Sequence, residues 1–365
     1  MKRAGLAVLT LVVLAVVAYQ FVVHPAGGGG IGLGAPPAGP AATVRGSIGG
    51  EKVGLLKDPQ FQKILRERYG LTVDYTRSGS IDMIKEATGK DFIWPATQIA
   101  LEMLREKGGK FEKSEILFNS PVVLYSRGPV TAALIKQGVV EKVGDTYYIH
   151  DLPKLIKMIN SGTRWKEIGL PELYGKVSVV STDPTRSSSG TLFAGLVANI
   201  MNGGEVVDEG SVKSVLPAVK QLFARQGYMQ SSSGDLFNQF LQQGMGSFPI
   251  IAGYEAQLIE FSIENAQYRD LLRKEITTLY PRPTVWSSHP FIALNSNGSR
   301  LLTALQDPEI QRLAWERHGF RSGLIGVQND PKVLQVNGVP ATVQNVIPTP
   351  SPRTMERILA ALGNN

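Results

Sequence analysis

The chain has 365 residues, of which 43% are hydrophobic and 19% are charged, so it is neither a disordered chain nor a polytopic membrane protein. The absence of cysteine excludes disulfide scaffolds, zinc ribbons, iron–sulfur clusters, thiol nucleophiles and a lipid-modified cysteine anchor. The formal charge of +7 includes no dense run of lysine and arginine, which argues against nucleic acid as a partner.

Residues 1–24 are expected to form a transmembrane anchor or a signal segment. Lys2 and Arg3 precede an apolar stretch, residues 4–23, which is just long enough to cross a bilayer as a helix. The basic flank places the rest of the chain outside the cytoplasm. Small residues at 16–18 offer a cleavage site, but the apolar stretch is longer than a typical signal sequence, which favours an uncleaved anchor. We therefore expect the folded body in the periplasm or at the cell surface, anchored by residues 4–23, or secreted if cleavage occurs.

Residues 25–43 are expected to link the membrane segment to the body. From 25 to 42, 16 of 18 residues are glycine, proline or alanine. Such a composition forms no packed core and predicts a flexible tether. The body would then lie close to the membrane.

Short β-branched runs alternate with helix-period segments along the body, which predicts an α/β fold with a mainly parallel sheet. Asp58-Pro59 and Asp307-Pro308 are typical helix starts, and Gly70 is a typical helix end. The expected strands are residues 43–48, 71–75, 92–94, 116–126 and 176–181. The expected helices are residues 58–70, 97–106, 151–160, 192–201, 211–226 and 351–363.

Four turns between these strands and helices carry small hydroxylic residues, at 46–50, 78–80, 95–97 and 183–191. Ligands of open α/β sheets bind at such turns, where helix starts offer unpaired N–H groups and the positive end of the helix dipole. Together with glycines and hydroxyls, they suit a small anion or a carboxylate, and Arg186 adds a permanent charge. Because serine, threonine and glycine also cap ordinary helices, a purely structural role is the alternative for each turn.

The order of these turns, followed by a crossover at Asn119–Val123 and by Ala252–Glu255, resembles that of bacterial extracellular solute-binding proteins of the type II periplasmic class. The resemblance covers about residues 44–362, and the turn at 183–191 is similar to the helix start of phosphate-type binders. It implies two α/β lobes joined by a hinge, with residues 44–125 plus 284–365 in lobe 1 and 126–283 in lobe 2. It also implies a small-molecule solute held between the lobes and an ABC permease as the partner. No cofactor is expected, and the four histidines, which are far apart in the sequence, argue against a metal site.

Phosphate binders carry an aspartate two residues before the Ser-Gly-Thr of this helix start, whereas this chain has Ser187. We therefore expect a fully ionised oxyanion, a carboxylate-bearing solute or a neutral one, with the first two favoured. Glu255 is expected to be an exposed residue at a helix start. The predicted ligand-binding residues are Ser47, Gly49, Ser78 and Ser80 from lobe 1, and Arg186, Ser188, Ser189, Gly190, Thr191 and Tyr254 from lobe 2.

Two other functions compete with solute import. A sensory or scaffolding module would use the same lobes without a transporter. A serine-dependent hydrolase would need a base beside Ser188 or Ser189, and no histidine or lysine is recognisably placed for that role; the common hydrolase and nucleotide-binding motifs are also missing from the sequence. Trp94, next to a candidate turn, would either stack on a sugar or pack in the core.

Overall fold

The computed structural model describes residues 40–363 of the chain. The expected membrane segment and most of the expected linker lie outside these residues. Between residues 40 and 363, no helix combines the length and the apolar character that crossing a membrane requires. The described residues belong to one compact unit.

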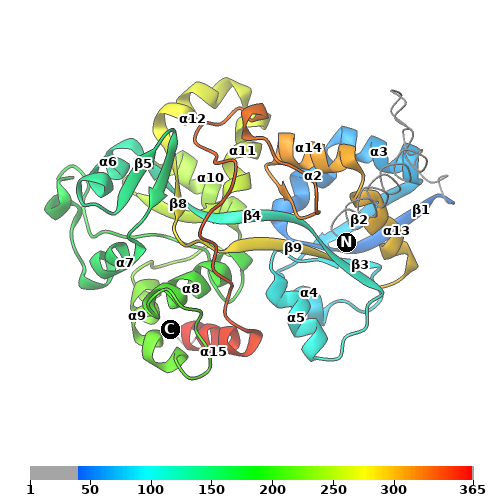
Figure 1. Ribbon diagram of the computed structural model, residues 1–365, viewed down its shortest axis with the longest axis horizontal. Coiled ribbons are helices and arrows are strands. Elements are labelled where there is room, and N and C mark those ends of the chain that lie inside the picture. Colours follow the sequence, from blue (N-terminus) through cyan, green and yellow to red (C-terminus); the bar gives the residue numbers. More distant parts are fainter. Residues whose placement is uncertain (1–39, 364–365) are drawn as a thin grey trace, which may run out of the picture. The chain divides into compact units, whose positions relative to one another are not determined.

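Helices and strands alternate along most of this unit (Figure 1). The strands are β1 (Ala42–Ile48), β2 (Leu71–Arg77), β3 (Phe92–Trp94), β4 (Lys113–Arg127), β5 (Val140–Val143), β6 (Thr146–Ile149), β7 (Ile250–Tyr254), β8 (Ile276–Pro281), β9 (Trp286–Ala293) and β10 (Arg321–Ser322). The α-helices are α2 (Val53–Lys57), α3 (Pro59–Tyr69), α4 (Asp82–Lys85), α5 (Gln98–Glu106), α6 (Gly128–Lys136), α7 (Leu152–Ser161), α8 (Ser188–Met201), α9 (Val212–Ala224), α10 (Ser233–Gln243), α11 (Glu255–Glu264), α12 (Arg269–Glu275), α13 (Ser296–Leu305), α14 (Pro308–His318) and α15 (Pro352–Gly363). Short 3₁₀ helices are η1 (Gly50–Lys52), η2 (Trp165–Ile168), η3 (Ala266–Tyr268) and η4 (Pro331–Val333).

One long strand, β4, is shared by two half-sheets (Figure 1). Its first part, Lys113–Pro121, pairs with β9 beside β3, β1 and β2. Its second part, Val122–Arg127, pairs with β7 and β8, and β6 and β5 follow. The two half-sheets define lobe 1 and lobe 2, so the two-lobed α/β prediction is confirmed.

The sheet is mixed, not mainly parallel as the sequence predicted. The pairs β1–β2, β1–β3 and β6–β8 are parallel, but every partner of β4 runs antiparallel to it. The pair β4–β9 is antiparallel because β4 leaves lobe 1 and β9 returns to it in the opposite direction. Residues 176–181 form no strand either, and Val180 makes a single bridge to Ile251 of β7.

The helix boundaries predicted from capping residues are confirmed. The carboxylate of Asp58 accepts hydrogen bonds from the N–H groups of Gln60 and Phe61 at the start of α3. Gly70 ends this helix with φ of 63°, a conformation that glycine adopts without strain. Asp307 caps α14 in the same way as Asp58 caps α3.

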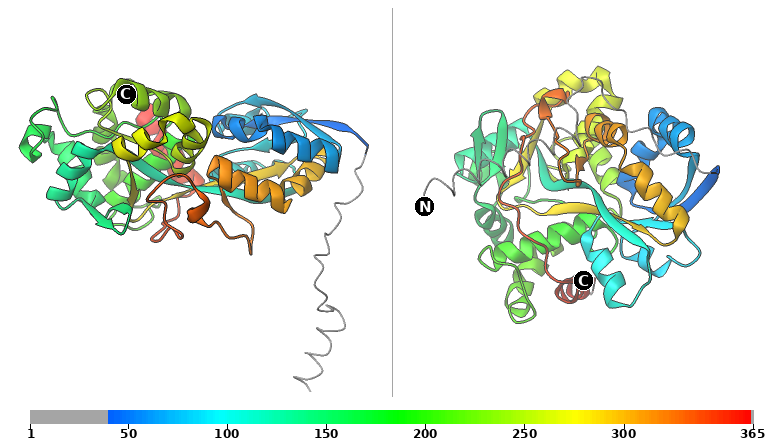
Figure 2. Two further views of the ribbon diagram at one scale, coloured as in Figure 1. Left: turned by 90° about the horizontal axis from the view of Figure 1, so that it is seen from above. Right: turned by 45° about the vertical axis from the view of Figure 1, so that its right-hand side comes forward.

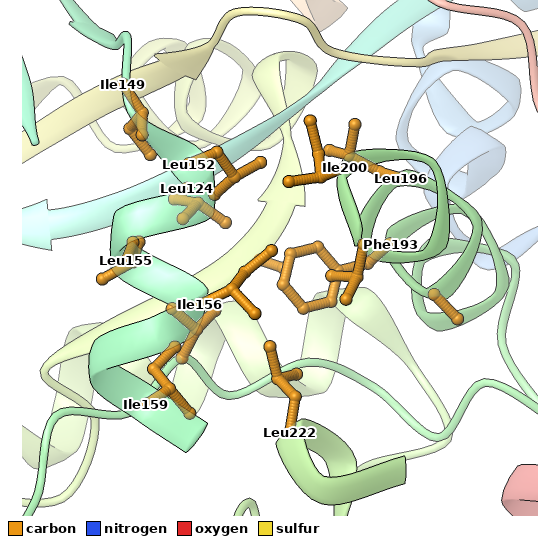
Figure 3. Packing of buried hydrophobic residues seen from close by; sticks show 14 of the residues in the cluster. Leu124, Ile149, Leu152, Leu155, Ile156, Ile159, Phe193, Leu196, Ile200 and Leu222 are labelled. Atoms are coloured by element: carbon orange, nitrogen blue, oxygen red, sulfur yellow. The ribbon is translucent and has the colours of Figure 1, made fainter. Parts of the chain in front are cut away.

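Each lobe has its own hydrophobic core. In lobe 1, Phe92 and Phe291 stack with their ring centroids 5.0 Å apart between β3 and β9. In lobe 2, apolar side chains of α7, α8 and α9 meet beside β4 (Figure 3). All residues of α8 from Ser189 to Ile200 are buried, so this helix lies at the centre of its lobe and its start is rigidly placed.

The described chain passes between the lobes three times. The first passage is β4, and the second is the link from β8 to β9, where the N–H of Val122 donates to the carbonyl of Val285 at 3.0 Å. The third is the crossing segment, residues 323–351, which leads from β10 to α15 and is drawn in dark orange and red in Figures 1 and 2.

The C-terminal helix α15 packs in lobe 2, whereas the sequence assigned all of residues 284–365 to lobe 1. Met355, Ile358 and Leu362 of α15 belong to the same buried cluster as the apolar side chains of α8 and α9. The physical reason is the amphipathic face of α15, which the crossing segment carries over to α8 and α9. The lobe 1 prediction therefore needs correction for this helix.

Candidate ligand site between the lobes

Two of the predicted turns, one from each lobe, face each other. The hydroxyl oxygens of Ser80 and Ser188 lie 2.6 Å apart and share a hydrogen bond. A Cβ atom built on Gly79 would lie only 3.2 Å from the carbonyl oxygen of Arg186. The turn that follows β2 in lobe 1 and the turn that precedes α8 in lobe 2 thus close on one crevice.

A cavity of about 390 Å³ lies in this crevice. Its volume is within the range of about 300–1,000 Å³ that is typical of sites for small molecules. Five of the ten predicted residues line it, namely Gly49, Ser78, Arg186, Ser188 and Tyr254. The other lining residues are Gly50, Glu51, Arg77, Gly79, Asp82, Ser187, Ser231, Ser232, Ser233 and Asp235.

The predicted contacts Ser47 and Ser80 do not line the cavity, and their assignment is corrected. The hydroxyl of Ser47 is buried behind the wall, where it bonds the hydroxyl of Thr76 at 3.1 Å and the ammonium of Lys90. Ser80 accepts a hydrogen bond from the N–H of Ala96 at 2.9 Å, so its side chain holds two turns of lobe 1 together while it bonds Ser188.

Ser189, Gly190 and Thr191 also lie behind the wall, because they build the start of α8. The hydroxyl of Ser189 lies 2.7 Å from that of Thr182, and the hydroxyl of Thr191 donates to the carbonyl of Pro184 at 2.7 Å. The side chains of Ser189 and Thr191 therefore shape the turn that presents Arg186 and Ser188 and do not line the cavity, so any contact of these three residues with a ligand would come from backbone N–H groups.

Replacing Gly190 by alanine should destabilise the fold by about 1–3 kcal/mol, the usual cost of overpacking. A Cβ at this position would lie 2.3 Å from the carbonyl oxygen of Thr182, which is backbone and cannot rotate away. Urea unfolding measures the loss. Gly128→Ala is the control, because a Cβ at the first residue of α6 meets no atom within 4 Å; equal stability of the two variants would contradict the packing argument.

A second serine-rich helix start, at the beginning of α10, lines the cavity and was missed. Residues 231–237 read Ser-Ser-Ser-Gly-Asp-Leu-Phe, and residues 187–193 read Ser-Ser-Ser-Gly-Thr-Leu-Phe. The two copies begin α10 and α8, and both helix starts border the same cavity. This heptapeptide, repeated with one difference, Asp235 in place of Thr191, is the sequence signal that could have revealed the second turn.

The ionic groups of the cavity leave two arginines unpaired. The carboxylate of Glu51 is paired with the ammonium of Lys52, and that of Asp82 is paired with Lys85 at 2.7 Å. Within residues 40–363, neither Arg77 of lobe 1 nor Arg186 of lobe 2 has a carboxylate within 4.0 Å, and Asp235 has no cationic partner. The unpaired charges of the lining, two arginines and one aspartate, therefore add up to a net positive charge.

The start of α8 adds to this positive character. The hydroxyl of its N-cap residue, Ser187, bonds the hydroxyl of Ser189 at 3.1 Å and accepts from no backbone N–H of the first turn, which leaves these N–H groups without a capping side chain. The helix dipole places a partial positive charge at the same point. Arg77, Arg186 and this uncapped helix start together would stabilise a small anion.

Comparisons with known proteins agree with this architecture. No family model and no curated protein sequence matches the chain. Among solved structures, the sulfate-binding protein SubI of Mycobacterium tuberculosis is 17% identical, with a TM-score of 0.53 and coverage of 89% of this chain and 96% of the other. The periplasmic binding protein AfuA of Actinobacillus pleuropneumoniae with fructose-6-phosphate is 13% identical, with a TM-score of 0.58 and coverage of 90% and 98%. Iron-bound HitA of Pseudomonas aeruginosa is 12% identical, with a TM-score of 0.58 and coverage of 88% and 99%.

The chain has the type II periplasmic-binding-protein fold. At these identities the likeness concerns the fold, and the chemistry of the site has to come from its own residues. Within the described part of the chain, no group of three or more histidine, aspartate or glutamate side chains is placed to hold a metal ion. Trp94 is fully buried and its indole N–H donates to the carbonyl of His289 at 3.2 Å, so it packs in the core and is not a stacking platform at the surface of the site.

Buried polar groups lie beneath the cavity in this fold. Tyr254 and His289 are both buried, and neither the phenol oxygen of Tyr254 nor Nδ1 of His289 has a hydrogen-bond partner among the described residues. Burial raises the pKa of Tyr254, and the nearby carboxylate of Glu51 raises it further. Burial also lowers the pKa of His289 well below its ordinary value, and the charge of Lys52 adds to this effect. His289 is therefore neutral near pH 7.

The buried His289 should make the folded protein lose stability as the pH falls below about 6.5, the ordinary histidine pKa. In that range the unfolded chain binds a proton at this residue and the folded chain does not, which lowers the free energy of unfolding by up to about 1.4 kcal/mol per pH unit. Urea unfolding of the wild type and of His289→Gln between pH 5 and 8 isolates this contribution. A constant difference between the two proteins over this range would show that the burial argument is wrong.

Proposed function

We propose that the chain is an extracytoplasmic solute-binding protein that captures a small anion, an oxyanion or a carboxylate, for an ABC-type importer. The observation that carries this proposal is the pair of unpaired arginines, Arg77 from lobe 1 and Arg186 from lobe 2, at one cavity beside the uncapped start of α8. The proposed ligand contacts are Gly49, Ser78, Arg77, Arg186, Ser188 and Tyr254. Residues 4–23 would keep the protein at the membrane that holds the permease.

The mechanism is capture by closure, without a covalent step. An anion that binds Arg77 contacts one lobe, and Arg186 and Ser188 reach it only when the lobes are closed. Because these extra contacts exist only in the closed form, the bound solute shifts the population toward that form. A permease that recognises the closed form then receives loaded protein.

Thermal unfolding of the full chain in a mild detergent tests the proposal. Sulfate, phosphate, molybdate and small carboxylic and phosphorylated acids are compared with neutral sugars and polyamines. A ligand at 100 times its dissociation constant stabilises the folded state by about 2.7 kcal/mol, so a bound anion should raise the melting temperature clearly. Stabilisation by polyamines or neutral sugars alone, or by no solute at millimolar concentration, would reject anion capture.

A further inference from the structure

We propose that the solute is an organic anion that also carries a hydroxyl or amino group, and that Glu51, His289 and Tyr254 bind this hydrogen-bond donor. The inference rests on the proposed function and narrows its substrate class. The acidic group of the solute would occupy the large cavity between Arg77 and Arg186. The donor group would occupy a smaller cavity beside it, which is called the inner cavity below.

The inner cavity has a volume of about 200 Å³ and shares part of its wall with the large cavity. Glu51, Arg77 and Tyr254 line both, and His289 lines the inner one. A solute with its acidic group in the large cavity can therefore extend a second group to His289. The combined space also exceeds what a single tetrahedral oxyanion fills, which favours an organic molecule.

The hydrogen bonds of Ser287 define the tautomer of His289. Ser287 donates its single hydroxyl proton to the carbonyl of Ala96 at 2.7 Å. In its contact with Nε2 of His289, at 3.1 Å, the serine oxygen must then accept, so Nε2 carries the ring proton. Because His289 is neutral, Nδ1 is left as a bare acceptor.

Two acceptor atoms consequently lie close together at the wall of the inner cavity. Nδ1 of His289 lies 3.6 Å from Oε1 of Glu51, and this carboxylate oxygen already accepts a hydrogen bond from the ammonium of Lys52. Because Lys52 serves Glu51, Nδ1 of His289 is the acceptor left without a donor, and a donor group of the solute beside Glu51 would satisfy it. A hydroxyl or an ammonium group supplies such a proton, whereas fully ionised sulfate or molybdate supplies none.

Tyr254 provides the third group of this arrangement, from lobe 2. The hydroxyls of Ser189 and Ser287 lie near its phenol and partly offset the rise of its pKa, but both are already engaged with other partners. The phenol therefore keeps its proton. It is free to hydrogen-bond to the same hydroxyl or amino group of the solute, or to a solute atom next to that group. This geometry connects lobe 1 and lobe 2 through the donor end of the solute as well as through its acidic end.

Isothermal titration of the full chain with matched pairs of solutes tests the inference. Malate and aspartate are compared with succinate, and glycerol 3-phosphate is compared with propyl phosphate; the members of each pair carry similar acidic groups and differ in the donor. We expect at least one hydroxylated or aminated member to bind about tenfold or more tightly than its partner, because the partner leaves Nδ1 of His289 unsatisfied. Tyr254→Phe, which removes one oxygen, should reduce this preference, while the exposed Tyr174→Phe should leave it unchanged.

The outcomes separate the inference from the proposed function. Anion binding without any preference within the pairs, or sulfate and molybdate binding as tightly as the best organic anion, would overturn the inference and leave anion capture intact. Binding of no anion at all would reject both. A preference that Tyr254→Phe and Glu51→Gln leave unchanged would place the donor elsewhere and would overturn the assignment to the inner cavity.

Discussion

Replacing Arg186 by alanine should weaken the binding of small anions by about ten- to a hundredfold, equivalent to about 1.4–3 kcal/mol. The guanidinium has no carboxylate partner within residues 40–363, so an anion in the cavity would be its first strong acceptor. Its side chain is exposed, which keeps the expected loss below that of a fully buried charge pair. Titration calorimetry with the best anion found by thermal unfolding measures the effect.

Arg77→Ala and the double variant sharpen this test. If both guanidinium groups bind the same anion, the two losses should not add, and the double-mutant cycle should give a coupling energy. Arg312→Ala is the matched control, because it removes the same charge from the exposed face of α14, where Arg312 pairs with Glu316 at 2.8 Å. Unchanged affinity in Arg186→Ala would remove this residue from the site.

Replacing Glu255 by glutamine should lower the free energy of unfolding by about 3–5 kcal/mol. The sequence predicted an exposed glutamate at a helix start, but its side chain is almost completely buried. Its two carboxylate oxygens accept from Arg321 at 2.6 and 2.9 Å, and Tyr280 donates to it at 2.7 Å. The variant would leave the charge of Arg321 buried without a counter-charge, which is the costly state.

A second pair of variants checks this explanation. Glu209→Gln breaks an ion pair with Arg357 in which both side chains are about half exposed, and it should cost at most about 1 kcal/mol. The combined change of Glu255 and Arg321 to glutamine should cost less than the sum of the single changes, since it leaves no lone buried charge. Additive losses in urea unfolding would show that the ion pair is not the cause.

The parts of the fold that depend on local chemistry could be predicted from the sequence. Asp58 and Asp307 cap their helices because a carboxylate beside a proline suits a helix start wherever it occurs. The serine turn before α8 was recognised for the same reason. Its partner turn at 78–80 was recognised by its position after a strand, and the two do lie together.

The parts that depend on contacts between distant residues could not be predicted. Ser189 and Thr191 have the composition of ligand-binding residues, but the buried position of α8 turns their hydroxyls toward Thr182 and Pro184. Likewise, nothing local shows that Glu255 meets Arg321, 66 positions away. The placement of α15 in lobe 2 also depends on a long crossing segment without regular periodicity.

The crossing segment has a consequence for how the cleft can open. Two adjacent passages, such as β4 and the β8–β9 link, would let one lobe twist about their common axis as well as swing away from the other. The third passage is hydrogen-bonded to the β8–β9 link and to lobe 2: the N–H of Ile347 donates to the carbonyl of Thr284, and Asn199 of α8 donates to the carbonyl of Pro348. We expect this third connection to restrain twisting of the lobes, so that the two arginines meet a solute in the same geometry at every closure.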